Sequence, residues 1–312
     1  MRVLFPDISN PYGGKGWFLH GLVAKLRQIG VQVTHDAHDD YDVSLENIRI
    51  RTKTKRPIVV RLDGVYHDTS IPWAEKNASL KDAAERATAI VCQSEYGKRM
   101  VREYLNADES KISIIHNGTD LNAETIDPEL THQHNFVALS VWRPHKRLED
   151  IIKAFLVADI PDSCLRILGK MGAGMTDDIY RYASDRVVFM GQITDRPRLL
   201  GYLKTATAMI HLCWFDCCPN SVVEAIGQRC PVICSNEGGT HELVEPSNGI
   251  VLPLDRQYDL KPVDLYQPPP VDINKVAEAM HIIVRVKPPI FNSHVDINRT
   301  AAFYKKVFES VL

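Results

Sequence analysis

Apolar runs that are typical of buried strands alternate with amphipathic helical segments along almost the whole chain. The first such unit has a strand at 2–6, a turn formed by Gly13, Gly14 and Gly16, a helix, and a second strand at 31–35. A strand–helix–strand unit joins parallel strands, because the helical crossover returns the chain to the same edge of the sheet. The alternation therefore predicts an α/β fold, with parallel sheets that helices cover on both faces.

A polar segment, 121–135, interrupts this alternation and is typical of a linker between domains. The strands expected before it are 57–62, 87–94 and 111–118, and those expected after it are 136–142, 165–169, 186–191, 208–214, 231–235 and 249–253. The length of 312 residues suits two α/β domains, although one large domain stays open. We expect an N-terminal domain at 1–130, a C-terminal domain at 131–295, and a final helix at 296–312 that packs back on the N-terminal domain.

Composition argues against several classes of function. The formal net charge is -2 and the isoelectric point is near 6.6, which gives no electrostatic footprint for nucleic acid. The cations of segment 49–56 are more typical of a solvated loop than of a patch for phosphate or an anionic membrane. No apolar run reaches the roughly 18 residues of a membrane span, and Pro6 and Asp7 come too early for a secretory signal. We expect a cytoplasmic protein without a transmembrane segment; peripheral membrane contact stays open.

The seven cysteines are an odd number and lie mostly in apolar, strand-like runs, which favours reduced thiols in the core. A zinc site is the alternative, built from the five cysteines between 213 and 234 with His211 or His241. The paired CxxC knuckles of structural zinc sites are missing, so we expect no metal.

The segment 214–245 contains a polar loop, a helix start, a buried strand and a glycine turn in immediate succession. Asn220 and Ser221 mark the helix start, and Val222 begins its apolar face. Backbone N–H groups at a helix start point outward at the positive end of the helix dipole, so a phosphate or diphosphate is a natural occupant. Glu224, about one turn further in, could then bind sugar hydroxyls.

Three cations, Arg143, Lys146 and Arg147, stand between an expected strand and an expected helix. This position is the carboxyl edge of the sheet, where open α/β sheets bind ligands. Cations are unfavourable at a helix start unless an anion offsets them, so the pattern favours a bound diphosphate. Gly13 and Gly14 would allow the backbone to approach such a group, or they form a plain turn; neither GxGxxG nor a P-loop is present.

The order of these motifs resembles family 4 of the retaining glycosyltransferases, which have the GT-B fold. The resemblance rests on the early glycine pair, KISIIHNGTD, the Arg/Lys strand end, RVVFMG, and the acidic pair followed by CPVICSNEGGTHELVE. It covers essentially the whole chain and is strongest from Asn117 to Leu252. It implies two Rossmann-like doubly wound domains that face a cleft, an acceptor domain first and a nucleotide-sugar donor domain second.

The resemblance also implies the activity, transfer of a hexosyl group from a nucleotide-diphosphate sugar to an acceptor hydroxyl with the anomeric configuration kept. Glu224 would hold the ribose, while Asp216 and the amides near Asn220 and Ser221 would hold the donor sugar and its phosphates. Arg143 and Lys146 would neutralise the departing diphosphate. The remaining residues expected to bind the donor are Gly13, Gly14, Asp63, Arg147, Gly191 and Val222.

This chain departs from the family pattern in three ways. Asp216 replaces the first glutamate of the acidic pair and is one methylene shorter. Arg143 and Lys146 are closer together than usual, so Lys146 and Arg147 compete for one role. The first domain is also short for the family.

His67, in RLDGVYHD, resembles the histidine that the family places near the donor sugar, and we expect it to be catalytic. Asp63 competes for that role, and a solvated loop histidine is the alternative. Asn117 is expected to be a turn residue that shapes the cleft, with ligand contact left open. Asp40 and Asp42 match the Asp-x-Asp of metal-dependent transferases, but so short a pattern arises by chance and is interpreted as a surface loop.

The expected partners are a nucleotide-sugar donor and a sugar, a lipid or a protein-linked acceptor, with no cofactor and no nucleic acid. The protein could be a monomer or a homodimer. Two alternatives remain for the function: a sugar-nucleotide epimerase with the same fold, and a catalytically degenerate sugar-nucleotide-binding protein.

Overall fold

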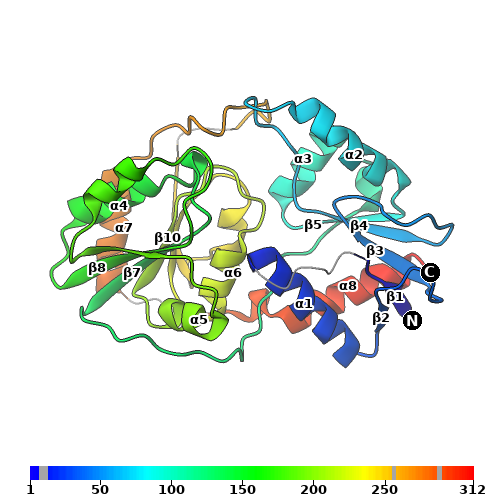
Figure 1. Ribbon diagram of the computed structural model, residues 1–312, viewed down its shortest axis with the longest axis horizontal. Coiled ribbons are helices and arrows are strands. Elements are labelled where there is room, and N and C mark those ends of the chain that lie inside the picture. The colour runs from blue at the N-terminus through cyan, green and yellow to red at the C-terminus, as the bar shows by residue number, and fades with distance from the viewer. Residues whose placement is uncertain (7–12, 255–257, 287–289) are drawn as a thin grey trace. The chain divides into compact units, whose positions relative to one another are not determined.

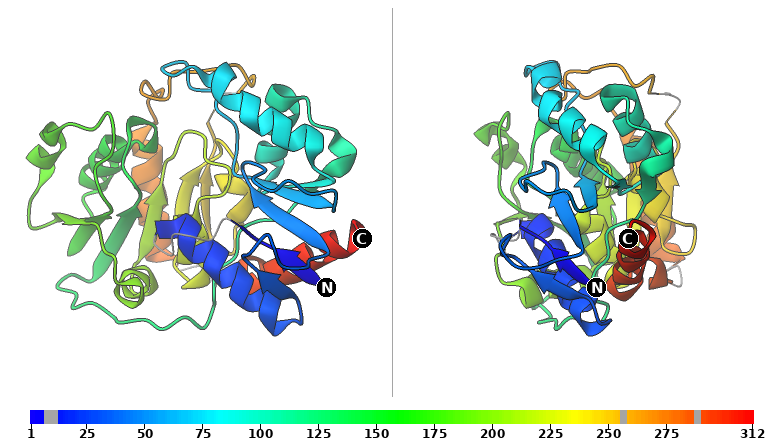
Figure 2. Two further views of the ribbon diagram at one scale, coloured as in Figure 1. Left: turned by 45° about the vertical axis from the view of Figure 1, so that its right-hand side comes forward. Right: turned by 90° about the vertical axis from the view of Figure 1, so that its right-hand side faces the viewer.

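The computed structural model describes residues 1–6, 13–254, 258–286 and 290–312. Within these residues the chain forms two compact units. Unit 1 comprises Met1–Asp120, Asp259–Val263 and His294–Leu312; unit 2 comprises Leu121–Tyr258 and Asp264–Ser293. Both chain ends therefore belong to unit 1 (Figure 2).

Unit 1 contains a six-stranded sheet in the order β2-β1-β3-β4-β5-β6 (Figure 1). Every neighbouring pair is parallel. The strands are β1 (Arg2–Leu4), β2 (Gln32–Thr34), β3 (Val43–Asn47), β4 (Ile58–Leu62), β5 (Ala89–Cys92) and β6 (Ile112–Ile114). The helices are α1 (Gly13–Gln28), α2 (Trp73–Arg86), α3 (Glu95–Leu105) and α8 (Ile297–Ser310), with short 3-10 turns η1 (Glu109–Lys111) and η5 (Ser293–Val295).

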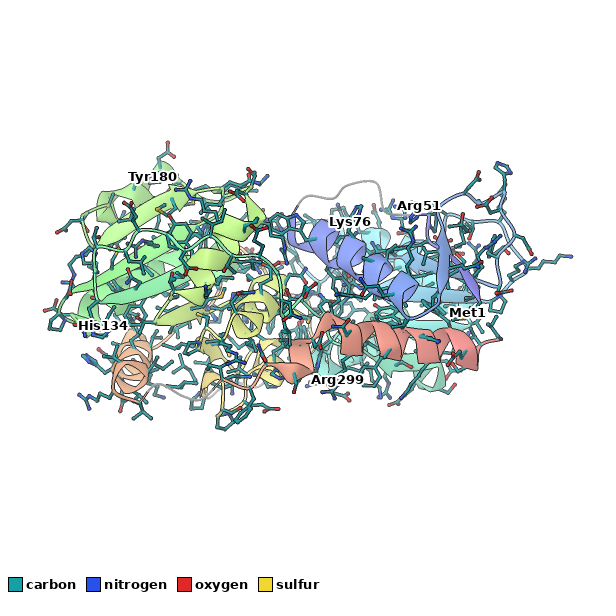
Figure 3. The ribbon with its side chains drawn as sticks, turned by 90° about the horizontal axis from the view of Figure 1, so that it is seen from below. Met1, Arg51, Lys76, His134, Tyr180 and Arg299 are labelled. Carbon is teal, nitrogen blue, oxygen red and sulfur yellow. The ribbon has the colours of Figure 1, made fainter. Side chains whose placement is uncertain are left out.

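Two hydrophobic cores cover the two faces of this sheet. Helices α1 and α8 pack side by side (Figures 1 and 3) and share one core, in which Phe18 and Tyr304 meet Val59 of β4. Helices α2 and α3 build the other core, in which Leu80 meets Val60. Val59 and Val60 face opposite ways because successive strand residues alternate between faces.

Unit 2 contains a second six-stranded parallel sheet, in the order β12-β11-β10-β7-β8-β9. Its strands are β7 (His134–Leu139), β8 (Ser163–Leu168), β9 (Val187–Gly191), β10 (Ala208–His211), β11 (Val232–Ser235) and β12 (Gly249–Leu252). Its helices are α4 (Leu148–Ala158), α5 (Arg196–Lys204), α6 (Asn220–Gly227) and α7 (Ile273–Arg285), with 3-10 turns η2 (Pro144–Lys146), η3 (Asp177–Tyr182) and η4 (Thr240–Leu243). Phe155 of α4 and Met280 of α7 pack with Ile210 of β10 in one large core.

The expected α/β fold with doubly wound parallel sheets is confirmed. The Asp272 side chain caps α7 by accepting from the N–H groups of Asn274 and Lys275. The expected turn at Gly13, Gly14 and Gly16 is wrong, because α1 already begins at Gly13. None of the helices in the described residues is both long and apolar enough to cross a bilayer.

Strand β3 was not expected from the sequence, because VSLEN carries three polar residues. All five residues are nevertheless buried. The Glu46 carboxylate, which is 0 % exposed, accepts from the Ser44 hydroxyl, the Arg51 N–H and the Thr52 N–H. Buried polar groups are tolerated when they are hydrogen-bonded in this way. The same bonds hold the basic loop 48–57, in which Arg51 lies (Figure 3), against the sheet.

Candidate active site

The strand order of unit 2 places a ligand site by topology alone. From β7 the chain adds β8 and β9 on one side and then adds β10, β11 and β12 on the other. The loops after β7 and β10 therefore leave the carboxyl edge on opposite sides of the switch point, where open α/β sheets bind ligands. A backbone hydrogen bond joins the two loops, with the Trp214 N–H donating to the His145 carbonyl at 2.8 Å.

Lys146 and Asp216 meet at this switch point. The Lys146 Nζ lies 2.6 Å from the Asp216 Oδ2, and their side chains are only 14 % and 24 % exposed. Burial alone would lower the pKa of Lys146, but the attraction of Asp216 outweighs it and the pKa is raised. Burial likewise opposes ionisation of Asp216, but Lys146 holds its pKa below the usual value. The site therefore keeps a fixed ammonium beside a fixed carboxylate at neutral pH.

His211 and Cys213 are buried next to this ion pair. Burial, and then the Lys146 charge, lower the pKa of His211 to about 3. Burial raises the pKa of Cys213 to about 11, although its thiol hydrogen-bonds Lys146. Both groups are therefore neutral over the physiological pH range.

His211, Cys213 and Asp216 are also the one group in the described part of the chain whose possible metal-ligand atoms lie within 4.8 Å of one another. The Lys146 ammonium already bonds to two of the three, Cys213 and Asp216. A cation held on the chain thus occupies the place that a metal would need.

Arg143 and Arg147 have different surroundings, although both flank η2. Arg143 precedes η2 with an extended backbone and is exposed, which suits a contact with an incoming anion. The Arg147 side chain is 0 % exposed and donates to the Leu212 carbonyl at 3.1 Å and to both oxygens of Glu237. The donor contact expected of Arg147 stays a prediction; the structure gives this arginine a buried partner that the sequence did not indicate.

Helix α6 begins beside Asp216, at Asn220. Pro219 precedes it, the Pro219 cap position makes no side-chain hydrogen bond to the first turn, and Val222 is fully buried. The first backbone N–H groups of a helix lack partners within that helix, so this end favours an anion. The phosphate contacts expected near Asn220 and Ser221 stay a prediction.

Glu224 lies one turn further along α6 and is 5 % exposed. Its Oε1 accepts from the Arg196 Nη1 at 2.7 Å. Burial raises the pKa of Glu224, and Arg196 offsets part of that effect. Arg196 is a second residue of this region that the sequence patterns did not indicate.

Gly191 ends β9 with a φ of 65° and is exposed. Its carbonyl accepts from the Gly169 N–H at 2.7 Å.

The loop after β11 packs against the backbone of Asp216. The Gly239 N–H donates to the Asp216 carbonyl at 2.7 Å. Gly238 has a φ of 64°, and a Cβ there would lie 2.7 Å from the Asp216 backbone nitrogen and oxygen. The glycine pair in SNEGGTHE is thus explained by a close approach of two backbones. The sequence shows the two glycines but does not show that the Asp216 backbone is the segment that approaches them.

Unit 1 holds a separate polar cluster at the carboxyl end of β4. The Asp63 carboxylate accepts from Arg61 and from the Gln93 Nε2 at 2.6 Å, and the Lys15 Nζ lies 3.8 Å away. Arg61 also donates to the Asn117 Oδ1 at 3.0 Å. Lys15 follows Gly13 and Gly14 in the first turn of α1, so the start of this helix lies near Asp63.

His67 is 8 % exposed, so the alternative of a solvated loop histidine is wrong. Burial lowers its pKa, against a hydrogen bond between its ring and the Val65 carbonyl. Asp40 and Asp42 lie away from these groups, in the connection between β2 and β3. Arg56 pairs with Asp40 at 2.6 Å, and the Asp42 Oδ2 accepts from the Arg2 N–H.

Comparisons with known proteins agree with this architecture. The family model described as Glycosyltransferase Family 4 matches residues 2–123, and the model described as Glycosyl transferases group 1 matches residues 133–260. No curated protein sequence matches the chain at a significant level.

Solved structures match over the full length. HepE from Anabaena, in complex with UDP, shares 18% identity with a TM-score of 0.70, covering 99% of this chain and 100% of that one. Sucrose-phosphate synthase from Thermosynechococcus elongatus shares 15% identity with a TM-score of 0.73, covering 99% and 98%. The lipopolysaccharide outer core galactosyltransferase WaaB, in its apo form, shares 13% identity with a TM-score of 0.64, covering 100% and 99%. At these identities the likeness establishes the fold. Together with the two family models, it shows that the chain belongs to the glycosyltransferases of family 4 and group 1, enzymes with the GT-B fold.

Proposed function

We propose that this glycosyltransferase moves a hexosyl group from a nucleotide-diphosphate hexose to an acceptor hydroxyl and keeps the anomeric configuration. The observation that carries the proposal is the pairing of Lys146 with Asp216 at the switch point of unit 2, beside the start of α6. UDP is the first nucleotide to test, because the HepE structures contain UDP, UDP with glucose, and UDP-glucose.

The diphosphate of the donor would lie between the start of α6 and the cations of the loop after β7. Arg143 is exposed there, and Lys146 is held at a fixed position by Asp216. Fixed cations and helix amides stabilise the charge that develops on a leaving diphosphate, and they do so without reorganisation during the reaction. These groups would serve in place of a divalent metal.

In the transfer step, the bond between the anomeric carbon and the oxygen of the β-phosphate breaks. A new bond forms between the anomeric carbon and the acceptor oxygen on the same face of the sugar. The proton of the acceptor hydroxyl leaves with the departing diphosphate, so the products are the glycosylated acceptor and a nucleoside diphosphate. Asp216, kept ionised by Lys146, would accept hydrogen bonds from the sugar hydroxyls.

Glu224 would hold the ribose. Its carboxylate is paired with Arg196, which is 26 % exposed, so a ribose hydroxyl could share or replace that partner. In unit 1 we assign Asp63 and His67 to contacts with the reacting sugars, because both lie in the segment that follows β4.

The proposal is tested by titrating UDP and GDP calorimetrically into the wild type and into Lys146→Met. The matched control is Lys204→Met, which removes an exposed lysine that pairs with Asp127 at 3.1 Å in the same unit. We expect one nucleotide to bind the wild type and the control equally, and Lys146→Met to bind it at least tenfold more weakly. Equal binding by all three proteins, or no binding of either nucleotide, would remove the assignment.

A second experiment identifies the reaction. Nucleotide hexoses are incubated with and without a panel of sugar and lipid acceptors. Release of nucleoside diphosphate that requires an acceptor supports transfer, whereas a new free nucleotide sugar formed without acceptor would indicate an epimerase. The anomeric proton coupling in the NMR spectrum of the product then tests whether the configuration is kept.

A further inference from the structure

Arg147 combines two unfavourable features in the residue that follows Lys146. Its backbone is left-handed, with a φ of 52°, a conformation that a residue with a Cβ adopts at a cost. Its guanidinium is fully buried, and a buried charge is costly unless it is paired and hydrogen-bonded. Both features persist together only where the surrounding structure fixes them.

The guanidinium ties together three loops at the carboxyl edge of unit 2. Arg147 itself belongs to the loop after β7. It donates to Leu212, at the start of the loop after β10, at 3.1 Å, and to Glu237 in the loop after β11, where the Nη2–Oε1 distance is 3.3 Å. The Glu237 side chain is only 7 % exposed, so the pair is enclosed by protein on both sides.

Through these contacts, a continuous chain of covalent and hydrogen bonds runs from Arg147 through Glu237 and Asp216 back to Lys146. Glu237 is next to Gly238 and close to Gly239, whose N–H donates to the Asp216 carbonyl at 2.7 Å. Asp216 binds the Lys146 ammonium, and Lys146 is joined to Arg147 by a peptide bond. Moving any of the three loops would therefore change the position of Asp216 relative to Lys146.

We propose that the Arg147–Glu237 ion pair positions Lys146 and Asp216, and that this positioning, in place of the donor contact predicted for Arg147 from the sequence, is the role of the pair. The catalytic half of this inference rests on the proposed function; the structural half, the coupling of the loops, does not. A planar guanidinium that bonds both carboxylate oxygens fixes an orientation, which an ammonium cannot do.

The test uses Glu237→Gln, Arg147→Gly and the double variant that carries both changes. Glycine accepts the left-handed backbone, so Arg147→Gly removes the guanidinium without new strain. Each single variant leaves one buried charge unpaired and should lose stability, whereas the double variant leaves none and should regain it. The matched control is Arg166→Met, which removes another buried arginine of unit 2, one that bonds Asn135 near the start of β7.

Two readouts separate positioning from stability. We expect hydrogen exchange in segments 212–218 and 236–240 to rise at least fivefold in the double variant, and its kcat to fall at least tenfold, with a smaller loss of UDP affinity than Lys146→Met shows. Moving a catalytic group by about 1 Å can lower the rate about a hundredfold, so a tenfold loss of kcat requires only a smaller displacement of Lys146 or Asp216. The control should lose stability without either effect.

The inference is overturned if kcat recovers together with stability in the double variant, or if exchange in the two segments stays within twofold of wild type. If the glycine variants do not fold, Arg147→Lys must show the same effects, because it keeps the charge and loses the fork. Faster exchange in a protein that transfers no sugar would refute the proposed function and leave the coupling of the loops intact.

Discussion

Replacing His211 should make unit 2 less sensitive to acid. Burial lowers the pKa of His211 to about 3 in the folded protein, from 6.5 in an unfolded chain. Between these values the unfolded chain binds one more proton than the folded protein, so the free energy of unfolding falls as the pH falls below 6.5. When the unfolded chain binds one more proton, the free energy of unfolding falls by about 1.36 kcal/mol for each unit by which the pH falls. From pH 8 to pH 5 this histidine alone removes about 2 kcal/mol of stability.

The His211→Gln variant lacks the titrating ring and should lose about 2 kcal/mol less than the wild type over the same interval. The assay is urea denaturation at pH 8, 7, 6 and 5, with hydrogen exchange of peptides from β7, β8 and β10 to report unit 2. His241→Gln is the control, because it removes an exposed imidazole from the same unit. His67, in unit 1, contributes in the same direction but is unchanged in both variants. Parallel curves for wild type and His211→Gln would refute the argument that burial keeps this ring neutral.

The other predictions concern charge, caps and glycines. Arg143→Ala should lower kcat on the order of a hundredfold with no change in Tm, because Arg143 is exposed; a rate within threefold of wild type in steady-state kinetics would contradict its role. Treatment with EDTA followed by gel filtration should leave kcat within twofold, since fixed cations supply the charge; activity that returns only with added metal would show otherwise. Asp272→Ala should cost unit 2 about 1 kcal/mol, measured by urea denaturation, because it removes the cap of α7. Gly30→Ala, whose Cβ would meet nothing within 4 Å, should cost about 1 kcal/mol for a left-handed backbone; Gly238→Ala should cost more and should also lower kcat, because its Cβ meets the Asp216 backbone, and equal kcat values would count against that clash.

Much of the fold was predictable because helix and strand periodicities differ. Buried strands such as PIVVRL and PVICS are short apolar runs, and α4 shows its apolar face at helical spacing. Strand β3 could not be found this way, since the buried Glu46 carboxylate accepts hydrogen bonds from Ser44 in the same strand and from the Arg51 and Thr52 N–H groups in the following loop. Hydrophobic pattern does not encode such satisfaction of polar groups by distant residues.

The candidate site was predictable in its residue types and not in its pairings. The positions of Lys146 and Asp216 after two strands indicated a common edge, and strand order then brought them within 2.6 Å. The spacing did not separate Lys146 from Arg147; in the structure Lys146 pairs with Asp216, whereas the Arg147 side chain is buried. No local pattern indicates that Glu237, ninety positions later, receives that side chain.

The packing of α8 against α1 affects the order in which the chain can fold during synthesis. Domains made first on the ribosome usually fold first. Here the core of unit 1 that forms from the first residues made is complete only after the last helix is made, since Tyr304 and Phe308 belong to the same core as residues of α1 and the sheet. Unit 2 has all its residues once position 293 has been added, whereas a fragment that ends at Asp120 keeps an apolar face uncovered. Nascent chains of that length should need a chaperone, and a separately expressed 294–312 peptide should rescue the fragment in trans.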